Sequence, residues 1–159
     1  MARAYVGIGS NIGNRHAAIE QAITRLSALP ETYVRARSRT REYAAVGGPP
    51  QGPYLNAVVE LVTNLTPHVL LNALAVIEQG LGRQRPDAVR WGPRSMDLDL
   101  LLYEELILTE PELTIPHPRL HEREFVLEPL VEIAPHAYHP VKNCTALALL
   151  ESLRAGAAR

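Results

Sequence analysis

The stretch MDLDLLLY, residues 96–103, has the length and aliphatic content of a buried β-strand, yet it contains two aspartates. Alternate residues of a strand point to the same face, so Asp97 and Asp99 project together while the leucines beside them face the other side. Two carboxylates in a partly dry site repel each other and require a compensating cation. The segment therefore predicts a sheet with one packed face and one face that binds a cation.

Upstream of this strand, strand and helix patterns alternate along the chain. Apolar residues recur at spacings of three and four in the helical segments, and turn-forming residues separate the segments. The expected elements are a strand at residues 3–9, a helix from Asn14 to about Pro30, strands at 33–41 and 54–63, a helix begun by Thr66 and Pro67 and ended by Gly80 and Gly82, and the strand at 96–103.

The order β-α-β-β-α-β is the split βαβ arrangement called ferredoxin-like, in which an antiparallel sheet carries both helices on one face. We therefore predict an α+β fold with a ferredoxin-like βαββαβ core and a second sheet face left free for function. Additional C-terminal helices follow. Downstream we expect a strand or hairpin near 105–109, a proline-bounded segment at 115–119, helical turns from about 121 to 133 and a helix from about Thr145.

The composition is that of an ordinary globular protein, with 159 residues, 47% of them hydrophobic and 21% charged. We expect one domain over residues 1–159. A net charge of -1 argues against binding of nucleic acid or anionic lipid by the overall field, and a single cysteine, Cys144, excludes an internal disulfide. No run of about 18 apolar residues occurs, which disfavours membrane spanning, and the single cysteine fits a reducing cytosol. We expect a cytoplasmic monomer with no membrane or nucleic-acid partner.

Asp97 and Asp99 taken alone are more often a solvated sheet face than a metal site. Mg²⁺, however, takes one or two protein carboxylates and completes its octahedron with waters and phosphate oxygens, and two ions roughly 4 Å apart are feasible. Guanidinium groups, which fit phosphate oxygens bidentately, crowd the flanking sequence. They belong to Arg83, Arg85, Arg90, Arg94 and Arg123. Carboxylates, a metal ion and arginines together predict a polyphosphate site.

Two further residues and two loops add to this prediction. Trp91 stands at a loop-to-strand junction, where an indole either stacks on a planar heterocycle or plugs the edge of the core. Glu78 lies near the negative end of a helix dipole, a mildly unfavourable place that suggests a use for the acid. The loops at 44–53 and 82–92 are candidate lids that exclude water from a bound nucleotide.

With these residues assembled, the sequence resembles the 6-hydroxymethyl-7,8-dihydropterin pyrophosphokinase family of folate biosynthesis over nearly the whole chain. The matching motifs are VGIGSNIGNR (6–15), YLNAVVEL (54–61), GRQRPDAVRWGPRSMDLDLLLY (82–103), IPHPRLHEREFVLEPL (115–130) and EIAP (132–135). The resemblance implies transfer of the β,γ-pyrophosphoryl unit of ATP to the hydroxymethyl group of the pterin, which gives AMP and the pterin diphosphate.

The resemblance also implies roles for particular residues. Asp97 and Asp99 would bind two Mg²⁺ ions. The residues expected around the pterin are Tyr54, Asn56, Trp91 and Phe125. The residues expected around ATP are Glu78, Arg85, His117 and Arg123, with Arg83 and Arg94 as the catalytic arginines. The family commonly shows threonine and proline before Gly47, whereas this chain has Tyr43-Ala44-Ala45-Val46, so contacts of residues 43–46 with the pterin stay open.

Two other function classes were weighed. A nucleotidyltransferase of the polymerase-beta type also combines a glycine-serine turn with D-x-D, but in that class the two lie close in sequence, and here a full βαββα unit separates Gly9-Ser10 from Asp97. A ferredoxin-like RNA-binding module could use the arginines of residues 35–41 as a phosphate stripe. Such modules need exposed aromatic residues, and aromatics are only 5% of this chain, which favours a solvated sheet face.

Overall fold

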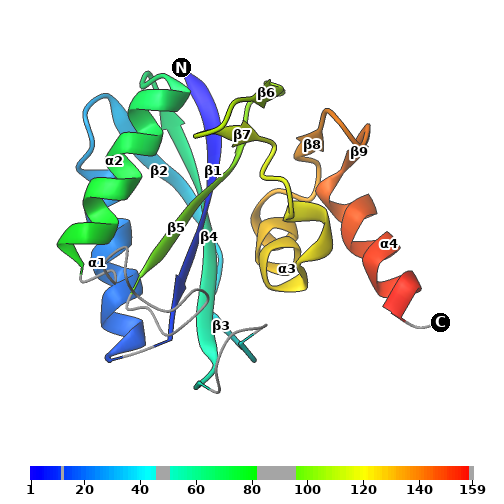
Figure 1. Cartoon of the computed structure of the whole chain (residues 1–159), viewed down its shortest axis with the longest axis horizontal. Coiled ribbons are helices and arrows are strands. Elements are labelled where there is room, and N and C mark those ends of the chain that lie inside the picture. The colour runs from blue at the N-terminus through cyan, green and yellow to red at the C-terminus, as the bar shows by residue number, and fades with distance from the viewer. Residues whose placement is uncertain (12, 46–50, 82–95, 158–159) are drawn as a thin grey trace.

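The computed structural model describes residues 1–11, 13–45, 51–81 and 96–157. Figure 1 shows a twisted sheet between two layers of helices. The elements are β1 (Ala2–Ser10), α1 (Arg15–Ser27), β2 (Thr32–Arg37), β3 (Arg41–Tyr43), β4 (Tyr54–Thr63), α2 (Pro67–Gly80), β5 (Asp97–Tyr103), β6 (Leu108–Thr109), β7 (Thr114–Ile115), the 3-10 turn η1 (Leu120–Glu122), α3 (Glu124–Ile133), β8 (Tyr138–His139), β9 (Cys144–Thr145) and α4 (Ala146–Ala157).

The main sheet has five strands in the order β2-β4-β1-β5, and β3 pairs with β4 beyond the end of β2. Every pairing is antiparallel, with Val6 of β1 opposite both Val59 of β4 and Leu100 of β5. Because β1 and β4 occupy the centre and each is joined to an outer strand through a helix, the core is ferredoxin-like. The predicted α+β class and βαββαβ order are confirmed.

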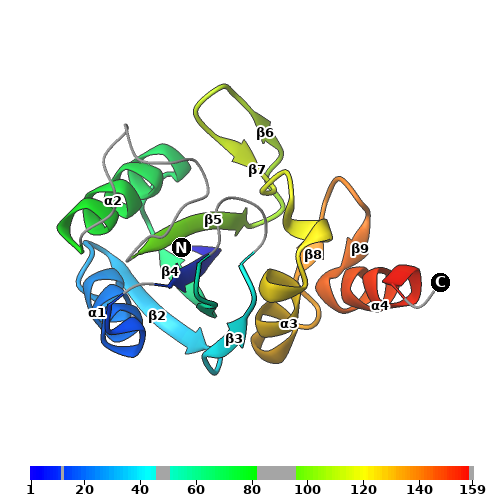
Figure 2. The ribbon, with the colours of Figure 1, turned by 60° about the horizontal axis from the view of Figure 1, so that its bottom comes forward.

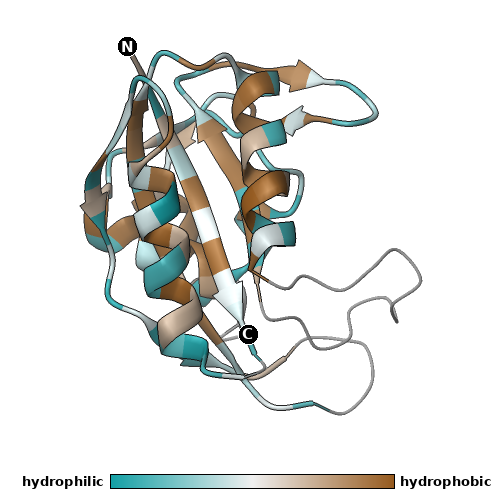
Figure 3. Ribbon diagram, turned by 90° about the vertical axis from the view of Figure 1, so that its left-hand side faces the viewer, coloured by the Kyte–Doolittle hydropathy of each residue, from teal (hydrophilic) through white to brown (hydrophobic). Residues whose placement is uncertain are grey.

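Helices α1 and α2 cover one face of this sheet, the helix face. Both begin at the predicted caps, since the Asn14 carboxamide oxygen accepts from the amide of Ala17 at 3.1 Å and the Thr66 hydroxyl accepts from the amide of Val69. Hydrophilic and hydrophobic bands alternate along both helices in Figure 3, as in amphipathic helices. The two helices therefore bury one stripe each against the strands.

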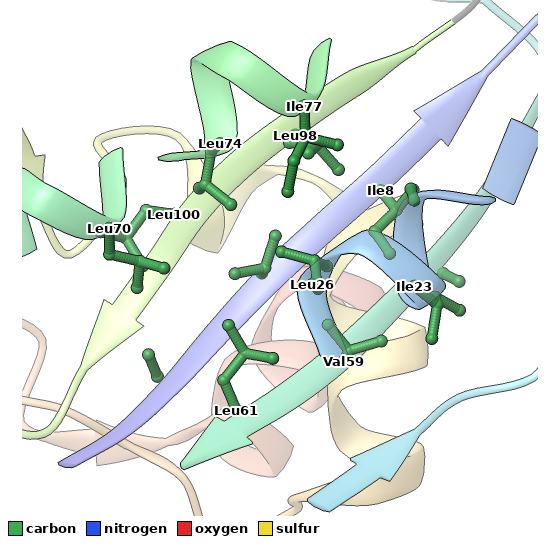
Figure 4. Close-up of a cluster of buried hydrophobic side chains, with 14 of the residues drawn as sticks. Ile8, Ile23, Leu26, Val59, Leu61, Leu70, Leu74, Ile77, Leu98 and Leu100 are labelled. Atoms are coloured by element: carbon green, nitrogen blue, oxygen red, sulfur yellow. The ribbon is translucent and has the colours of Figure 1, made fainter. Parts of the chain in front are cut away.

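The core beneath these helices interleaves aliphatic side chains from five elements. Figure 4 shows Leu74 and Ile77 of α2 above Leu98 and Leu100 of β5, while Leu26 of α1 lies above the central strands. All five of these side chains are at most 5% exposed. Burial of a leucine-sized side chain contributes roughly 1.5–3 kcal/mol, so this layer supplies much of the stability of the sheet.

We predicted that the opposite face of the sheet is left free, but it is partly covered. Helices α3 and α4 form a second core with Tyr5, Val58 and Leu101 of the sheet. Figures 1 and 2 show α3 on the side of the sheet away from α1 and α2, with α4 beside it. The apolar stripe of the C-terminal helices needed a surface to bury, and this half-covered face provides it. We call it the site face.

The predicted single strand at 33–41 is wrong. Strand β2 ends at Arg37 and β3 begins at Arg41, and the register of β2 on β4 shifts between Val34 and Ala36. Such a bulge reorients the side chains that follow it. As a result the arginines diverge: Arg35 bonds to Glu60 within the sheet, whereas Arg37 bonds to Glu20 on α1.

The remaining arginines of this stretch also meet carboxylates. Arg39 and Arg41 form ion pairs with Glu132 of α3, the second at 2.6 Å. Each of the four alternating arginines of residues 35–41 thus pairs with a glutamate. The stripe of unpaired arginines that an RNA-binding module would need is therefore not available. The prediction that these arginines form a solvated face is correct only in part, because their charges are neutralised by partners on the protein.

The C-terminal part contains two short hairpins. The sequence predicts the first only approximately and does not predict the second. The expected strand near 105–109 is β6, which pairs with β7, so that Leu108 lies opposite Ile115. Strands β8 and β9 form a second hairpin with Tyr138 opposite Thr145.

In the part of the chain that the structure describes, no helix is long and apolar enough to cross a membrane.

Candidate active site

A cavity of about 630 Å³ opens on the site face beside α3. It is lined by the ends of β1, β3, β4 and β5 and by the segment that runs from β7 into α3. The predicted site residues among its lining are Tyr54, Asn56, Asp97, Asp99, His117, Arg123 and Phe125. Residues far apart in the sequence, proposed for three different ligands, therefore converge on one hollow.

Asp97 and Asp99 point into this cavity, as the alternation of β5 predicts. Both are half-buried and line the cavity, while Leu98 between them is buried in the core of the helix face. Across the ladder Asp97 lies opposite Gly9 and Asp99 opposite Gly7. Gly7, Gly9 and both aspartates line the same cavity. An oxygen-only donor pair next to open space suits a hard cation such as Mg²⁺.

Gly9 also governs the position of Asn56 on the neighbouring strand. A Cβ atom added at Gly9 would lie 3.0 Å from the carboxamide oxygen of Asn56 and 3.4 Å from the ring of Tyr54. Asn56 itself is only 8% exposed. Within the described residues its Nδ2 atom is buried without a hydrogen-bond partner. A buried donor left unpaired costs about 1–3 kcal/mol, so this amide is suited to a ligand that supplies an acceptor.

The segment after β7 brings a histidine against the same aspartates. The His117 amide donates to the carbonyl of Leu101 at 2.9 Å, which docks the segment along β5. Burial lowers the pKa of His117 below its usual value; the nearby Asp99 opposes this shift, and Arg123 and Arg119 add to it. The imidazole is therefore neutral at pH 7, and because Nδ1 accepts from the amide of Arg119 at 3.2 Å, its Nε2–H is the hydrogen-bond donor.

Aromatic rings gather at the end of the cavity formed by β3, β4 and α3. Tyr43 lies opposite Tyr54 in the ladder, and its ring centroid is 6.2 Å from that of Phe125 at a tilt of 56°. The guanidinium carbon of Arg123 lies 5.5 Å from the centroid of the Phe125 ring, a cation–π distance. Tyr43 and Ala44 line the cavity, so two of the residues left open by the sequence do reach the site.

Sequence reasoning did not assign several other lining residues. These are Arg119, Glu122, Glu124 and Tyr43. The proline-bounded segment at 115–119 was recognised, and its position next to a predicted polyphosphate site was the available signal for Arg119. Nothing in the local pattern distinguishes Glu122 or Glu124 from the acids of an ordinary helix start, because their place in the site depends on how α3 docks.

Glu78 does not join the other predicted residues in this cavity. Its side chain is 5% exposed between α2 and β5, and Oε2 accepts a hydrogen bond from the amide of Leu98 at 2.8 Å. That amide belongs to the residue between the two aspartates. Glu78 thus binds the backbone of the site strand from the helix face, and its contact with ATP stays a prediction.

Five predicted residues lie outside the described part of the chain. They are Arg83, Arg85, Arg90, Trp91 and Arg94, and most of the two candidate lids lies there too. A separate group of potential metal ligands, His68, Glu110 and Glu112, is found among the described residues, where it joins the start of α2 to the β6–β7 turn. It lies away from the residues that line the cavity.

Comparison with known proteins identifies the family. Residues 5–135 match the family model of 7,8-dihydro-6-hydroxymethylpterin-pyrophosphokinase. The chain belongs to this family. The pyrophosphokinase prediction is thereby confirmed, with ATP as co-substrate and a small-molecule acceptor, and neither the RNA-binding nor the nucleotidyltransferase alternative is favoured.

Curated members of the pyrophosphokinase family are similar over most of their length. The protein from Methylorubrum extorquens is 46% identical over 135 residues, which cover 85% of this chain and 84% of that protein. The protein from Bacillus subtilis is 44% identical over 130 residues, 82% of this chain and 77% of that protein. Both are named 2-amino-4-hydroxy-6-hydroxymethyldihydropteridine pyrophosphokinase.

Solved structures agree on the fold. The wild-type HPPK-DHPS of Plasmodium falciparum with pteroate superposes with a TM-score of 0.73 over 95% of this chain, at 12% identity. The match covers 44% of that longer chain. At such low identity the likeness concerns the fold alone, and it confirms the sheet and helix arrangement described above.

Proposed function

We propose that the cavity on the site face is where this pyrophosphokinase transfers the β,γ-pyrophosphoryl group of ATP to the hydroxymethyl group of 6-hydroxymethyl-7,8-dihydropterin. The observation that carries this proposal is the meeting of two chemically different requirements in one hollow. Asp97 and Asp99 offer a cation site for the triphosphate, and the buried, unpaired amide of Asn56 offers a donor for a heterocycle.

The pterin would lie at the aromatic end of the cavity. A flat ring with carbonyl and ring-nitrogen groups along one edge needs a buried hydrogen-bond partner and apolar surfaces on its faces. Asn56 supplies the donor, and Tyr54 and Phe125 supply rings near it. Trp91, outside the described residues, would complete the clamp. The hydroxymethyl group would then point along β4 and β5 toward the aspartates.

Two Mg²⁺ ions would be held by Asp97 and Asp99, which are half-buried and lie opposite Gly9 and Gly7 across the ladder. Bound ions of this kind neutralise charge that develops on the phosphate oxygens and hold the triphosphate in line with its acceptor. The carboxylates themselves only position and balance charge. No side chain need form a covalent intermediate, because direct displacement requires positioning and electrostatic stabilisation.

In the transfer, the pterin hydroxymethyl oxygen forms a bond to the β-phosphorus and loses its proton to solvent water, and the bond from that phosphorus to the α,β-bridging oxygen breaks to release AMP. Arg123 and a neutral His117 line the cavity on the side of Asp99 and would donate to phosphate oxygens. Arg83 and Arg94 would stabilise the additional negative charge on the leaving AMP, and Arg85 and Glu78 would contact the nucleotide.

The identity of the nucleotide product tests this proposal. The purified chain is incubated with ATP, Mg²⁺ and the hydroxymethyl pterin, and the nucleotides are separated by chromatography. We expect AMP and pterin diphosphate in equal amounts, and no AMP when the pterin is left out. Formation of ADP, or of AMP at the same rate without the pterin, would contradict pyrophosphoryl transfer to this acceptor.

A variant of Asn56 tests the place of the pterin. Asn56→Leu keeps the branching of the side chain but removes the donor, and we expect the KM for the pterin to rise by about tenfold or more while the KM for ATP stays unchanged. Steady-state kinetics with each substrate varied in turn measures both. Equal changes in the two constants would mean that Asn56 does not face the pterin.

We also propose that residues 1–159 act as one domain and as a cytoplasmic monomer. The two cores that cover the opposite faces of one sheet support the single domain, because neither can be separated without exposing the strands. Size-exclusion chromatography with light scattering tests the monomer, for which 17.5 kDa is expected. Fractionation of cells tests the compartment.

A further inference from the structure

A chain of polar contacts links the aromatic end of the cavity to the C-terminal helix. The hydroxyl of Tyr43 on β3 donates to Oε1 of Glu128 on α3. The other oxygen of this carboxylate accepts from Nη2 of Arg154 on α4 at 2.6 Å. Nε of Arg154 donates in turn to Glu124, in the first turn of α3, at 3.0 Å. Arg154 therefore holds two carboxylates of α3 at once.

Tyr43, at one end of this series of contacts, lies in the proposed pterin site. Tyr43 lines the cavity, faces Tyr54 across the ladder and lies 6.2 Å from the ring of Phe125. Because Phe125 follows Glu124 directly, the two carboxylates that Arg154 binds flank the residue whose ring Tyr43 approaches. A change in the contacts of Arg154 would therefore be transmitted to two rings of the cavity.

The hydrogen bond between Tyr43 and Glu128 joins a neutral hydroxyl to a charged carboxylate. Burial raises the pKa of the Tyr43 phenol, and the hydrogen bond to Glu128 raises it further, so the hydroxyl keeps its proton. A neutral hydroxyl that donates to a carboxylate forms a charge-assisted bond, which is shorter and stronger than a neutral one. The phenol hydroxyl is thereby tied to Glu128, whose Oε1 also lies 3.7 Å from Nε of Arg41.

The ion pairs of Arg154, at the α4 end of this series of contacts, contribute little to the free energy of folding. The side chain of Arg154 is 51% exposed, and its carboxylate partners are 31% and 50% exposed. Exposed ion pairs contribute about 0–1 kcal/mol each, so their effect on stability is small. The effect of these ion pairs on the position of the ring can be larger than their effect on stability, because a ring displaced by a fraction of an ångström already weakens the binding of a stacked ligand.

We propose that Arg154 is a positioning residue for the pterin pocket, acting through Glu128 and the Tyr43 hydroxyl. The inference rests on the proposed function, since it concerns the same cavity. It assigns a role to α4, which begins at Ala146, beyond residues 5–135 that match the family. It also gives a role to Tyr43, whose hydroxyl reaches α3 from the segment in which this chain departs from the threonine and proline common in the family.

The test compares Arg154→Ala with a matched control, Arg37→Ala, which removes a similarly exposed arginine that bonds bidentately to Glu20 away from the cavity. We expect Arg154→Ala to raise the KM for the pterin by about fivefold, with kcat and the KM for ATP unchanged. Arg37→Ala should leave all three constants at the wild-type values. Thermal unfolding should show equal, small losses in both variants.

A double-mutant cycle then tests the route. Tyr43→Phe keeps the ring but removes the donor to Glu128, and should raise the KM for the pterin to the same extent. If the contacts act in series, Arg154→Ala adds nothing in the Tyr43→Phe background. Independent effects, which would multiply to about 25-fold, would overturn the inference.

Failure of the inference and failure of the proposed function give different results. Wild-type turnover of the pterin together with identical KM values in Arg154→Ala and Arg37→Ala would overturn the role of Arg154 alone. A wild-type chain that releases no AMP with the pterin would overturn the proposed function and, with it, this inference.

Discussion

The two faces of the main sheet are built from alternate residues of the same strands but have opposite roles. On the helix face Leu98 and Leu100 are at most 5% exposed beneath α2. On the site face Asp97 and Asp99 are half-buried beside glycine backbone at the edge of a cavity. Neighbouring positions of one strand therefore differ in their surroundings, with close packing on one side and a cavity, our proposed binding site, on the other.

This difference teaches where stability and activity can be separated. The helix face is completed by elements that adjoin it in sequence, and its side chains are close-packed. The site face is completed by α3 and α4 from the far end of the chain, and it keeps polar groups and open space near β1 and β5. Mutations on the first face should change the free energy of unfolding, and mutations on the second should change kinetics.

The largest effect is expected from removing one charge of the aspartate pair. Asp97→Asn and Asp99→Asn should each lower kcat by about a thousandfold or more, because a carboxamide is a poor ligand for Mg²⁺ and leaves charge on the triphosphate uncompensated. The free energy of unfolding should not fall, since repulsion between two acids is relieved. Product assays and denaturant titration measure the two quantities. A variant that keeps its Mg²⁺-dependent turnover would break the comparison.

A cavity in the helix face should have the reverse effect. Leu74→Ala on α2, at a side chain that is 1% exposed, should lower the free energy of unfolding by about 2–5 kcal/mol while the kcat of the folded fraction is kept. Val76→Ala on the same helix, at a side chain that is 68% exposed, is the matched control and should change stability by about 0.5 kcal/mol or less. Denaturant titration compares them. A large loss of kcat at full folding in Leu74→Ala would show that the faces are coupled.

Glu78 is the polar link between the faces, and its variants sharpen the comparison. Glu78→Ala leaves the buried amide of Leu98 without its acceptor and should cost about 1–3 kcal/mol of stability, whereas Glu78→Gln keeps an acceptor and should cost less. The KM for ATP distinguishes the two roles of this residue. An increase in Glu78→Gln, where the fold is kept, would mean that the acid also contacts the nucleotide.

The smallest effect is expected from a methyl group on the site face. Gly9→Ala places a Cβ 3.0 Å from the Asn56 carboxamide oxygen and should raise the KM for the pterin by about threefold to tenfold, because the amide must shift. Gly7→Ala, where the Cβ meets Leu101 at an ordinary 3.5 Å, is the control on the same strand and face. Equal pterin KM values in both variants would argue against a role for the position of Asn56.

Much of the helix face could be predicted because its signals are local. Asn14, Thr66 and Pro67 mark the starts of α1 and α2, and the limits of β4 coincide with the run of β-branched and aliphatic residues from 54 to 63. The shared face of Asp97 and Asp99 follows from alternation alone. These features need no knowledge of what lies across the sheet.

The parts that escaped prediction depend on distant contacts. The register shift between Val34 and Ala36 leaves no mark in an alternating sequence, so the arginines seemed to share a face. The burial of Glu78 follows from how α2 lies on β5. The bond from Tyr43 to Glu128 joins residues whose proximity depends on α3 docking beside β3, which no local periodicity encodes.

The unsatisfied amide of Asn56 has a consequence for discrimination among inhibitors. A compound that presents an acceptor to this nitrogen gains a bond that the free enzyme lacks, whereas a deaza analogue that presents a carbon there gains none and keeps the donor dehydrated. The cost of the unpaired donor is already present in the free enzyme, so the matching molecule relieves it and the deaza analogue leaves it in place. Selectivity at this position should therefore exceed what the contact area of a single side chain would suggest.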